Sequence, residues 1–148
     1  MTKHSPLNTL IELAVNDADE AAKRLGMAIR NAEATEQKLC LLIGYRDDYA
    51  MRFQANQAAG ITPMGYRNFQ AFLDKLDNAI SGQREIISHA NKMVVAERTA
   101  WQACERKRLS YDTLASRAQK EEQHRETKRD QKMTDEFATR QASHKREH

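Results

Sequence analysis

The stretch Ala59-Gly60-Ile61-Thr62-Pro63-Met64-Gly65 is where the chain is expected to reverse direction, because a proline and two glycines stand close together only here. Thr62 followed by Pro63 resembles a helix N-cap and the first helical position. The stretch therefore predicts a loop between two helices.

Apolar residues recur at alternating steps of four and three on both sides of this loop. Twelve of fourteen such positions before it are apolar, and twelve of fifteen after it. This spacing is typical of a coiled-coil seam. The first stripe comprises Leu7, Ile11, Ala14, Ala18, Ala21, Leu25, Ala28, Ala32, Thr35, Leu39, Leu42, Arg46, Tyr49 and Phe53. The second comprises Phe69, Leu73, Leu76, Ile80, Gln83, Ile87, Ala90, Val94, Glu97, Trp101, Cys104, Arg108, Tyr111, Ala115 and Ala118.

Two long helices and one short loop predict an all-α fold, a long antiparallel two-helix coiled-coil hairpin with an extended C-terminal helix. The loop length places Phe53 opposite Phe69, and the largest side chain, Trp101, opposite the small Ala21. The expected segments are a tail at 1–6, a hairpin at 7–118 (helix about 7–56, loop about 57–65, helix from about 66) and a polar extension at 119–148, helical or frayed.

The composition excludes several classes of protein. Leu, Ile, Val and Phe are only 25 of 148 residues, too few for a large globular core, whereas Ala, Leu, Glu, Lys and Arg are 68, which favours long helices. No apolar run is long enough for a membrane span or a signal peptide, so we expect a cytoplasmic protein. Cys40 and Cys104 suit that compartment, and in the hairpin they lie too far apart for a disulfide.

No motif for catalysis, a cofactor or a metal ion is apparent. Gly60 and Gly65 have the spacing of a phosphate-binding loop, but Tyr66 and Arg67 stand where that motif needs Lys and Ser or Thr. The five histidines lack metal-ligand spacing, and His89 is expected to face solvent. We therefore predict a protein that is not an enzyme. The pI near 8.9 leaves open the alternative of a basic coiled-coil module that binds nucleic acid, although the basic residues are spread evenly.

The sequence near the loop carries more apolar residues than one seam can bury. They form a second stripe beside the seam, which indicates either a partner-binding surface or a locally widened seam. The additional residues are Leu41, Ile43, Tyr45, Phe72, Leu76 and Ala79. In the extension, Met133 and Phe137 are an apolar pair with no partner in the chain, which indicates either binding to another protein or disorder.

These features together resemble the FliJ family of flagellar export proteins over nearly the whole chain. The resemblance rests on Leu7, Leu10 and Leu13-Ala14, on Leu42-Ile43-x-Tyr45-x-x-x-Tyr49, on Gly60-Ile61, on Phe72-x-x-x-Leu76-x-x-Ala79-Ile80, on Trp101, and on Asp130-Gln131-Lys132 with Asp135-Glu136-Phe137-Ala138. It implies a cytoplasmic component of the flagellar type III export apparatus, peripheral to the membrane through its partners. Such a protein is similar to the γ subunit of rotary ATPases.

The resemblance also implies partners and site residues. The family binds the centre of the hexameric export ATPase FliI, the export gate protein FlhA and flagellar export chaperones. It implies an export-gate patch, for which Leu42, Tyr45, Tyr49, Phe72, Leu76 and Ala79 match. Two polar positions at its edge depart from the family, with Lys38 in place of Gln and Gln83 in place of His. For the ATPase, the implied residues are Asp130, Gln131, Lys132 and Phe137.

Overall fold

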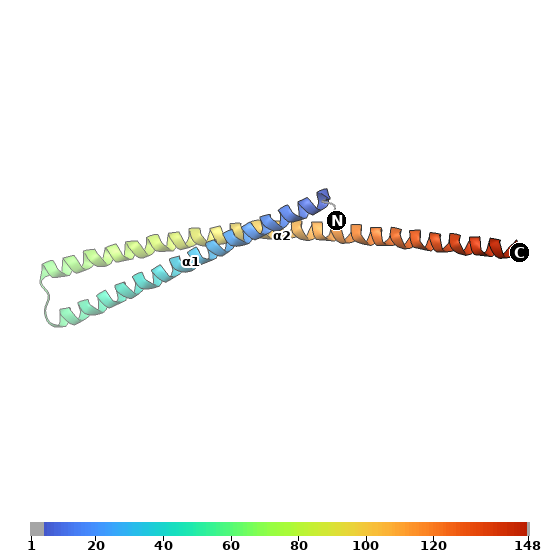
Figure 1. The fold of residues 1–148 in the computed structure, drawn as a ribbon. Helices are drawn as coiled ribbons and strands as arrows, with labels where there is room; N and C mark the ends of the chain where they lie inside the picture. Colours follow the sequence, from blue (N-terminus) through green and yellow to red (C-terminus); the bar gives the residue numbers. More distant parts are fainter. Residues whose placement is uncertain (1–4, 148) are drawn as a thin grey trace. The chain divides into compact units, whose positions relative to one another are not determined.

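Two helices make up almost all of the chain in the computed structural model, which describes residues 5–147. Helix α1 spans Pro6–Ala58 and helix α2 spans Pro63–Arg146, with residues 59–62 between them (Figure 1). Within the described range there is no strand. The predicted all-α class is confirmed, whereas most of the tail predicted at 1–6 lies outside the described residues.

Both helices begin with a hydroxyl cap followed by proline. Ser5 Oγ accepts a hydrogen bond from Asn8 N at 3.2 Å, and Thr62 Oγ1 accepts one from Gly65 N at 3.1 Å. A proline at the first helical position suits a helix start because its missing N–H has no intrahelical partner there. This confirms the cap expected at Thr62 and explains why α2 begins before residue 66.

Helix α1 ends at a glycine in a left-handed conformation. Gly60 has φ of 96°, and its N–H donates to the carbonyl of Gln57 at 3.2 Å. Glycine adopts this conformation without steric cost, so it stops the helix and redirects the chain.

The chain divides into two compact units. One, called here the hairpin unit, consists of residues 18–103; the other combines the residues up to Asp17 with those from Cys104 onward. In the hairpin unit the contacts between α1 and α2 join rising residue numbers on one helix to falling numbers on the other, as antiparallel helices require. These contacts are Arg24 with Glu97, Thr35 with Gln83, Arg46 with Asp77, and Phe53 with Phe69.

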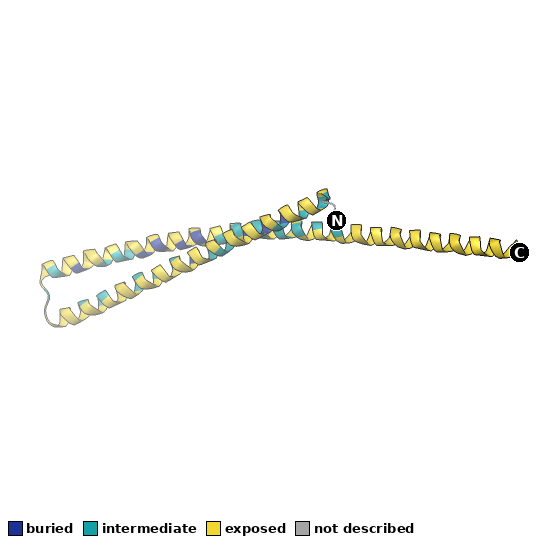
Figure 2. Cartoon of the chain, viewed as in Figure 1, coloured by how far each residue is buried: buried dark blue, intermediate teal, exposed yellow. Residues whose placement is uncertain are grey.

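Burial follows the predicted seam closely. All fourteen predicted positions of α1 are buried or half-buried, and so are fourteen of the fifteen in α2 (Figure 2). Ala18 and Ala21 are 2% and 0% exposed. The seam of α1 is therefore almost fully covered at these small residues. Ala118 is the exception and is exposed, because α1 begins at Pro6 and has no described residue left to face it.

Two glycines in the hairpin unit weaken its helices without a packing reason. A Cβ atom added at Gly44 or at Gly82 would meet nothing within 4 Å. We therefore expect Gly44→Ala and Gly82→Ala each to raise the free energy of unfolding by about 0.5–1 kcal/mol, since alanine loses less conformational entropy in a helix. Urea denaturation followed by circular dichroism measures the change.

Gly60→Ala is the control for this pair, because its positive φ disfavours any side chain. We expect that variant to be less stable than the parent. Equal changes in the free energy of unfolding for all three substitutions would contradict the view that Gly44 and Gly82 weaken their helices without a packing reason.

Candidate partner-binding surfaces

An aromatic cluster closes the hairpin unit next to the loop. The rings of Phe53 and Phe69 stack with centroids 3.6 Å apart, and those of Tyr49 and Phe69 with centroids 4.7 Å apart. The ring of Phe72 is tilted against that of Tyr49, with centroids 4.5 Å apart, and the ring centroids of Tyr66 and Phe53 are 5.7 Å apart. The Phe53–Phe69 stack confirms the predicted register, and the contact with Tyr49 fixes which side of the seam Phe72 occupies.

The six residues of the export-gate patch lie in the hairpin unit, along the side marked by the Tyr49–Phe72 contact. Leu42, Tyr49 and Leu76 are half-buried at the edge of the seam. The other three are exposed, with Tyr45 at 59% and Phe72 at 45%, together with the small Ala79. The structure therefore presents two exposed aromatic rings here, next to the half-buried Leu42, Tyr49 and Leu76.

Ile43 does not join the second apolar stripe, and Gln83 is a buried residue of the seam, as its place in the seam pattern predicts. Ile43 lies on the opposite side of the seam, where it lines a shallow hollow with Arg46 and Asp77. It is half-buried, so it widens the seam rather than extending the apolar stripe. Gln83 is only 4% exposed and cannot form a polar surface edge, whereas Lys38 is exposed and can.

The polar residues that interrupt the seam all have partners. Gln83 Nε2 donates to the carbonyl of Thr35 at 2.9 Å, which satisfies the buried amide. Arg46 pairs with Asp77 across the helices, as Arg24 does with Glu97 at 3.4 Å. Sequence reasoning missed these pairs, although the register places each partner within about one turn of the residue it meets.

The four tail residues implied for ATPase binding lie on an exposed helix. Every described residue from 116 onward is exposed. At about 100° per residue, Asp130 and Phe137 share one face, whereas Lys132 points to the far side. The structure therefore does not bring all four together.

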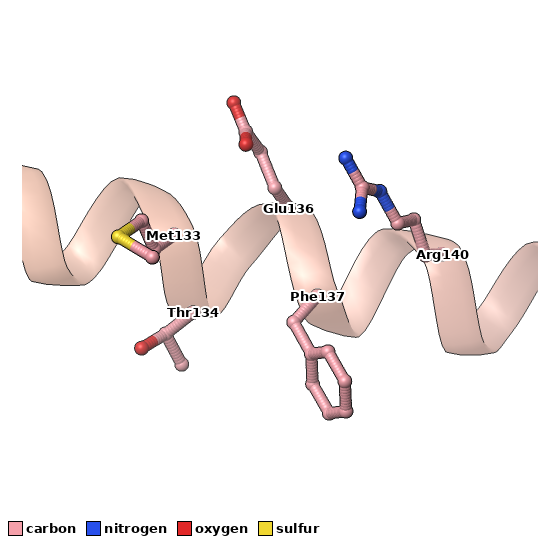
Figure 3. Close-up of a pocket in the computed structure, with 5 residues that line it drawn as sticks. All are labelled: Met133, Thr134, Glu136, Phe137 and Arg140. Atoms are coloured by element: carbon pink, nitrogen blue, oxygen red, sulfur yellow. The ribbon is translucent and has the colours of Figure 1, made fainter.

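Met133, which is not one of these four residues, lies on the same face of the helix as Phe137. The two are 66% and 63% exposed and line a shallow surface groove with Thr134, Glu136 and Arg140 (Figure 3). Figure 3 shows the Phe137 ring on one side of the helix, with Glu136 and Arg140 directed to the other. The i,i+4 spacing of two apolar residues was the signal for this pair.

Among residues 5–147, no group of three or more His, Cys, Asp or Glu side chains is arranged to hold a metal ion. His89 is exposed, as predicted, and Cys40 and Cys104 are free thiols. Neither described helix is long and apolar enough to cross a membrane.

Comparison with known proteins identifies the family. The family model described as "Flagellar FliJ protein" matches residues 2–147. Curated proteins named "Flagellar FliJ protein" from Escherichia coli (strain K12) and from Salmonella typhi are each 31% identical over 147 residues, covering 99% of this chain and 100% of each relative. The chain therefore belongs to the flagellar FliJ protein family.

Proposed function

We propose that this chain is a non-enzymatic component of the flagellar type III export apparatus that acts as a stalk-like adaptor. The observation that carries the proposal is the family match to residues 2–147, with relatives 31% identical over 99% of this chain and 100% of their own length. A long helical hairpin with exposed apolar side chains suits a protein that acts by binding other proteins.

In this proposal the tail binds the centre of the hexameric export ATPase FliI and promotes its assembly and activity. The tail forms a segment of its own at 119–148, distinct from a hairpin at 7–118. Met133 and Phe137 support this role, since they are exposed apolar side chains on an otherwise polar helix. Large apolar side chains of this kind are frequent anchors in helix-in-groove binding.

The hairpin is proposed to bind the export gate FlhA through Leu42, Tyr45, Tyr49, Phe72, Leu76 and Ala79. Exposed aromatic rings on a packed base favour protein contacts, because they bury a large area at small entropic cost. Through FlhA the protein is held peripherally at the cytoplasmic face of the inner membrane. It also binds export chaperones and returns them for further use.

The ATPase rate of the cognate export ATPase, measured with and without this protein, tests the adaptor proposal. We expect stimulation that is lost on deleting residues 130–148. Met133→Ala with Phe137→Ala is expected to raise the concentration needed for half-maximal stimulation by roughly ten-fold, because two anchors are removed.

The matched control for this experiment is Thr127→Ala with Thr139→Ala, neither of which lines the groove at Met133 and Phe137. Both hydroxyls donate to the preceding turn of their own helix, at 2.9 Å, so they contribute little to a partner surface. Undiminished stimulation after the deletion would refute the proposed contact. Absence of stimulation by the intact chain at any ratio would refute the role at the ATPase.

A further inference from the structure

The two sides of the hairpin unit have different surfaces. With the seam at heptad positions a and d, the Tyr49–Phe72 contact places positions g and c on one side, called here the aromatic flank. The Arg46–Asp77 pair places positions e and b on the other, called here the acidic flank. Because the helices are antiparallel, like positions of α1 and α2 share a flank.

Exposed large apolar side chains gather on the aromatic flank. Within residues 18–103, Val95 is the one exposed large apolar residue at an e or b position. Six occupy g or c positions on the aromatic flank, namely Met27, Leu41, Tyr45, Phe72, Ile86 and Met93. On α2 they belong to a stripe with a spacing of seven, which reads Phe72, Ala79, Ile86, Met93 and Ala100. The apolar surface thus continues beyond the export-gate patch, away from the loop.

The part beyond the patch, called here the distal flank, consists of Met27, Leu41, Ile86 and Met93 with Lys38 among them. Ile86 is 50% exposed and Met93 is 43% exposed. A spacing of seven keeps side chains in line along a coiled coil, so a further helix can lie along them. From Leu41 to Met27 the surface is about 20 Å long, the length of about four helical turns.

The two flanks also differ in charge. In the hairpin unit the g and c positions carry four basic residues and two acidic ones, whereas the e and b positions carry three basic residues and six acidic ones. On the distal flank Lys38 is exposed and enters no ion pair within residues 5–147. Arg24 at its far end is already paired with Glu97.

We infer that the distal flank binds an amphipathic α-helix of another protein whose apolar stripe is bordered by acidic residues. The apolar stripe would cover Ile86 and Met93, and an acidic side chain would reach Lys38. The site adjoins the export-gate patch at Lys38, but it is argued from Ile86 and Met93, which that patch does not include, and not from the proposed export function. A second copy of this chain fits less well, because the g and c positions of the distal flank hold Lys38 and no acidic residue that could pair with it.

Two helical peptides of three heptads test the inference. Both carry Leu along one stripe; one has Glu at the bordering positions and the other has Lys. Binding of each labelled peptide to the full chain is measured by fluorescence anisotropy. We expect the Glu-bordered peptide to bind, with affinity reduced about ten-fold or more by Ile86→Gln with Met93→Gln, since two apolar contacts are lost. We expect Lys38→Glu to weaken this peptide and to strengthen the Lys-bordered one.

Val95→Gln is the matched control, because Val95 is exposed on α2 but lies on the acidic flank. Binding of the Glu-bordered peptide should be the same as for the unaltered chain. Circular dichroism should show unchanged helix content for all variants, since every replaced side chain is exposed.

Three outcomes overturn the inference. The first is equal binding of both peptides, or of neither. The second is an equal loss of affinity in Val95→Gln. The third is sedimentation of the unaltered chain as a dimer that Ile86→Gln with Met93→Gln converts to a monomer, which would assign the distal flank to a second copy.

Discussion

Phe69→Ala is expected to lower the free energy of unfolding by about 3–5 kcal/mol, the usual effect of removing a buried phenylalanine. Phe69 is 9% exposed and its ring stacks on both Tyr49 and Phe53. Its loss leaves the cluster without its central ring, so the turns next to the loop should separate first. Urea denaturation gives the loss of stability, and amide hydrogen exchange should show the fastest opening in those turns.

Phe72→Ala is the control for this prediction. Phe72 contacts Tyr49 but is 45% exposed, so its removal should cost about 1 kcal/mol or less. Similar losses for Phe69→Ala and Phe72→Ala would contradict the view that Phe69 is the structural centre of the cluster.

Phe72→Ala combined with Leu76→Ala is expected to abolish swimming while leaving the helix content intact. If the export-gate patch binds FlhA, two of its apolar side chains on α2 are removed, and affinity should fall by roughly 30-fold or more. Swimming is measured on soft agar, and binding to the isolated gate protein is measured in parallel. Circular dichroism of the purified variant separates lost contact from lost structure.

Met51→Ala with Val95→Ala is the matched control, because both residues are exposed apolar side chains of the hairpin unit outside the aromatic flank. Cells with this variant should swim normally. Normal swimming with Phe72 and Leu76 both replaced would instead remove the patch from the proposal.

The seam could be predicted from the sequence because its cause is local. A stripe at steps of four and three specifies which residues of each helix are buried, and the loop length then fixes the register that Phe53 and Phe69 show. The cap at Thr62 was predictable for the same reason, since a helix start depends on a few neighbouring residues.

The flanks could not be predicted so well, because they depend on contacts between helices. Ile43 and Tyr45 are two residues apart and both apolar, yet they lie on opposite sides of the seam. Gln83 stands in the predicted seam stripe, but the hydrogen bond to the main-chain carbonyl of Thr35 that satisfies its buried amide leaves no pattern in the sequence. The tail remained ambiguous because an exposed helix makes no tertiary contact that would leave a pattern in the sequence.

The polar pairs across the seam bear on how the hairpin unit responds to mechanical load. A purely apolar seam with a repeat of seven has nearly equivalent alignments one heptad apart, so pulling one helix along the other could let it slip. Here a slip of seven residues in one direction would bring Arg46 level with Arg84 instead of Asp77, and a slip in the other direction would bring it level with Gln70. Either slip breaks the ion pair across the helices, and the first also sets two like charges against each other. The hairpin unit should therefore resist shear along its axis.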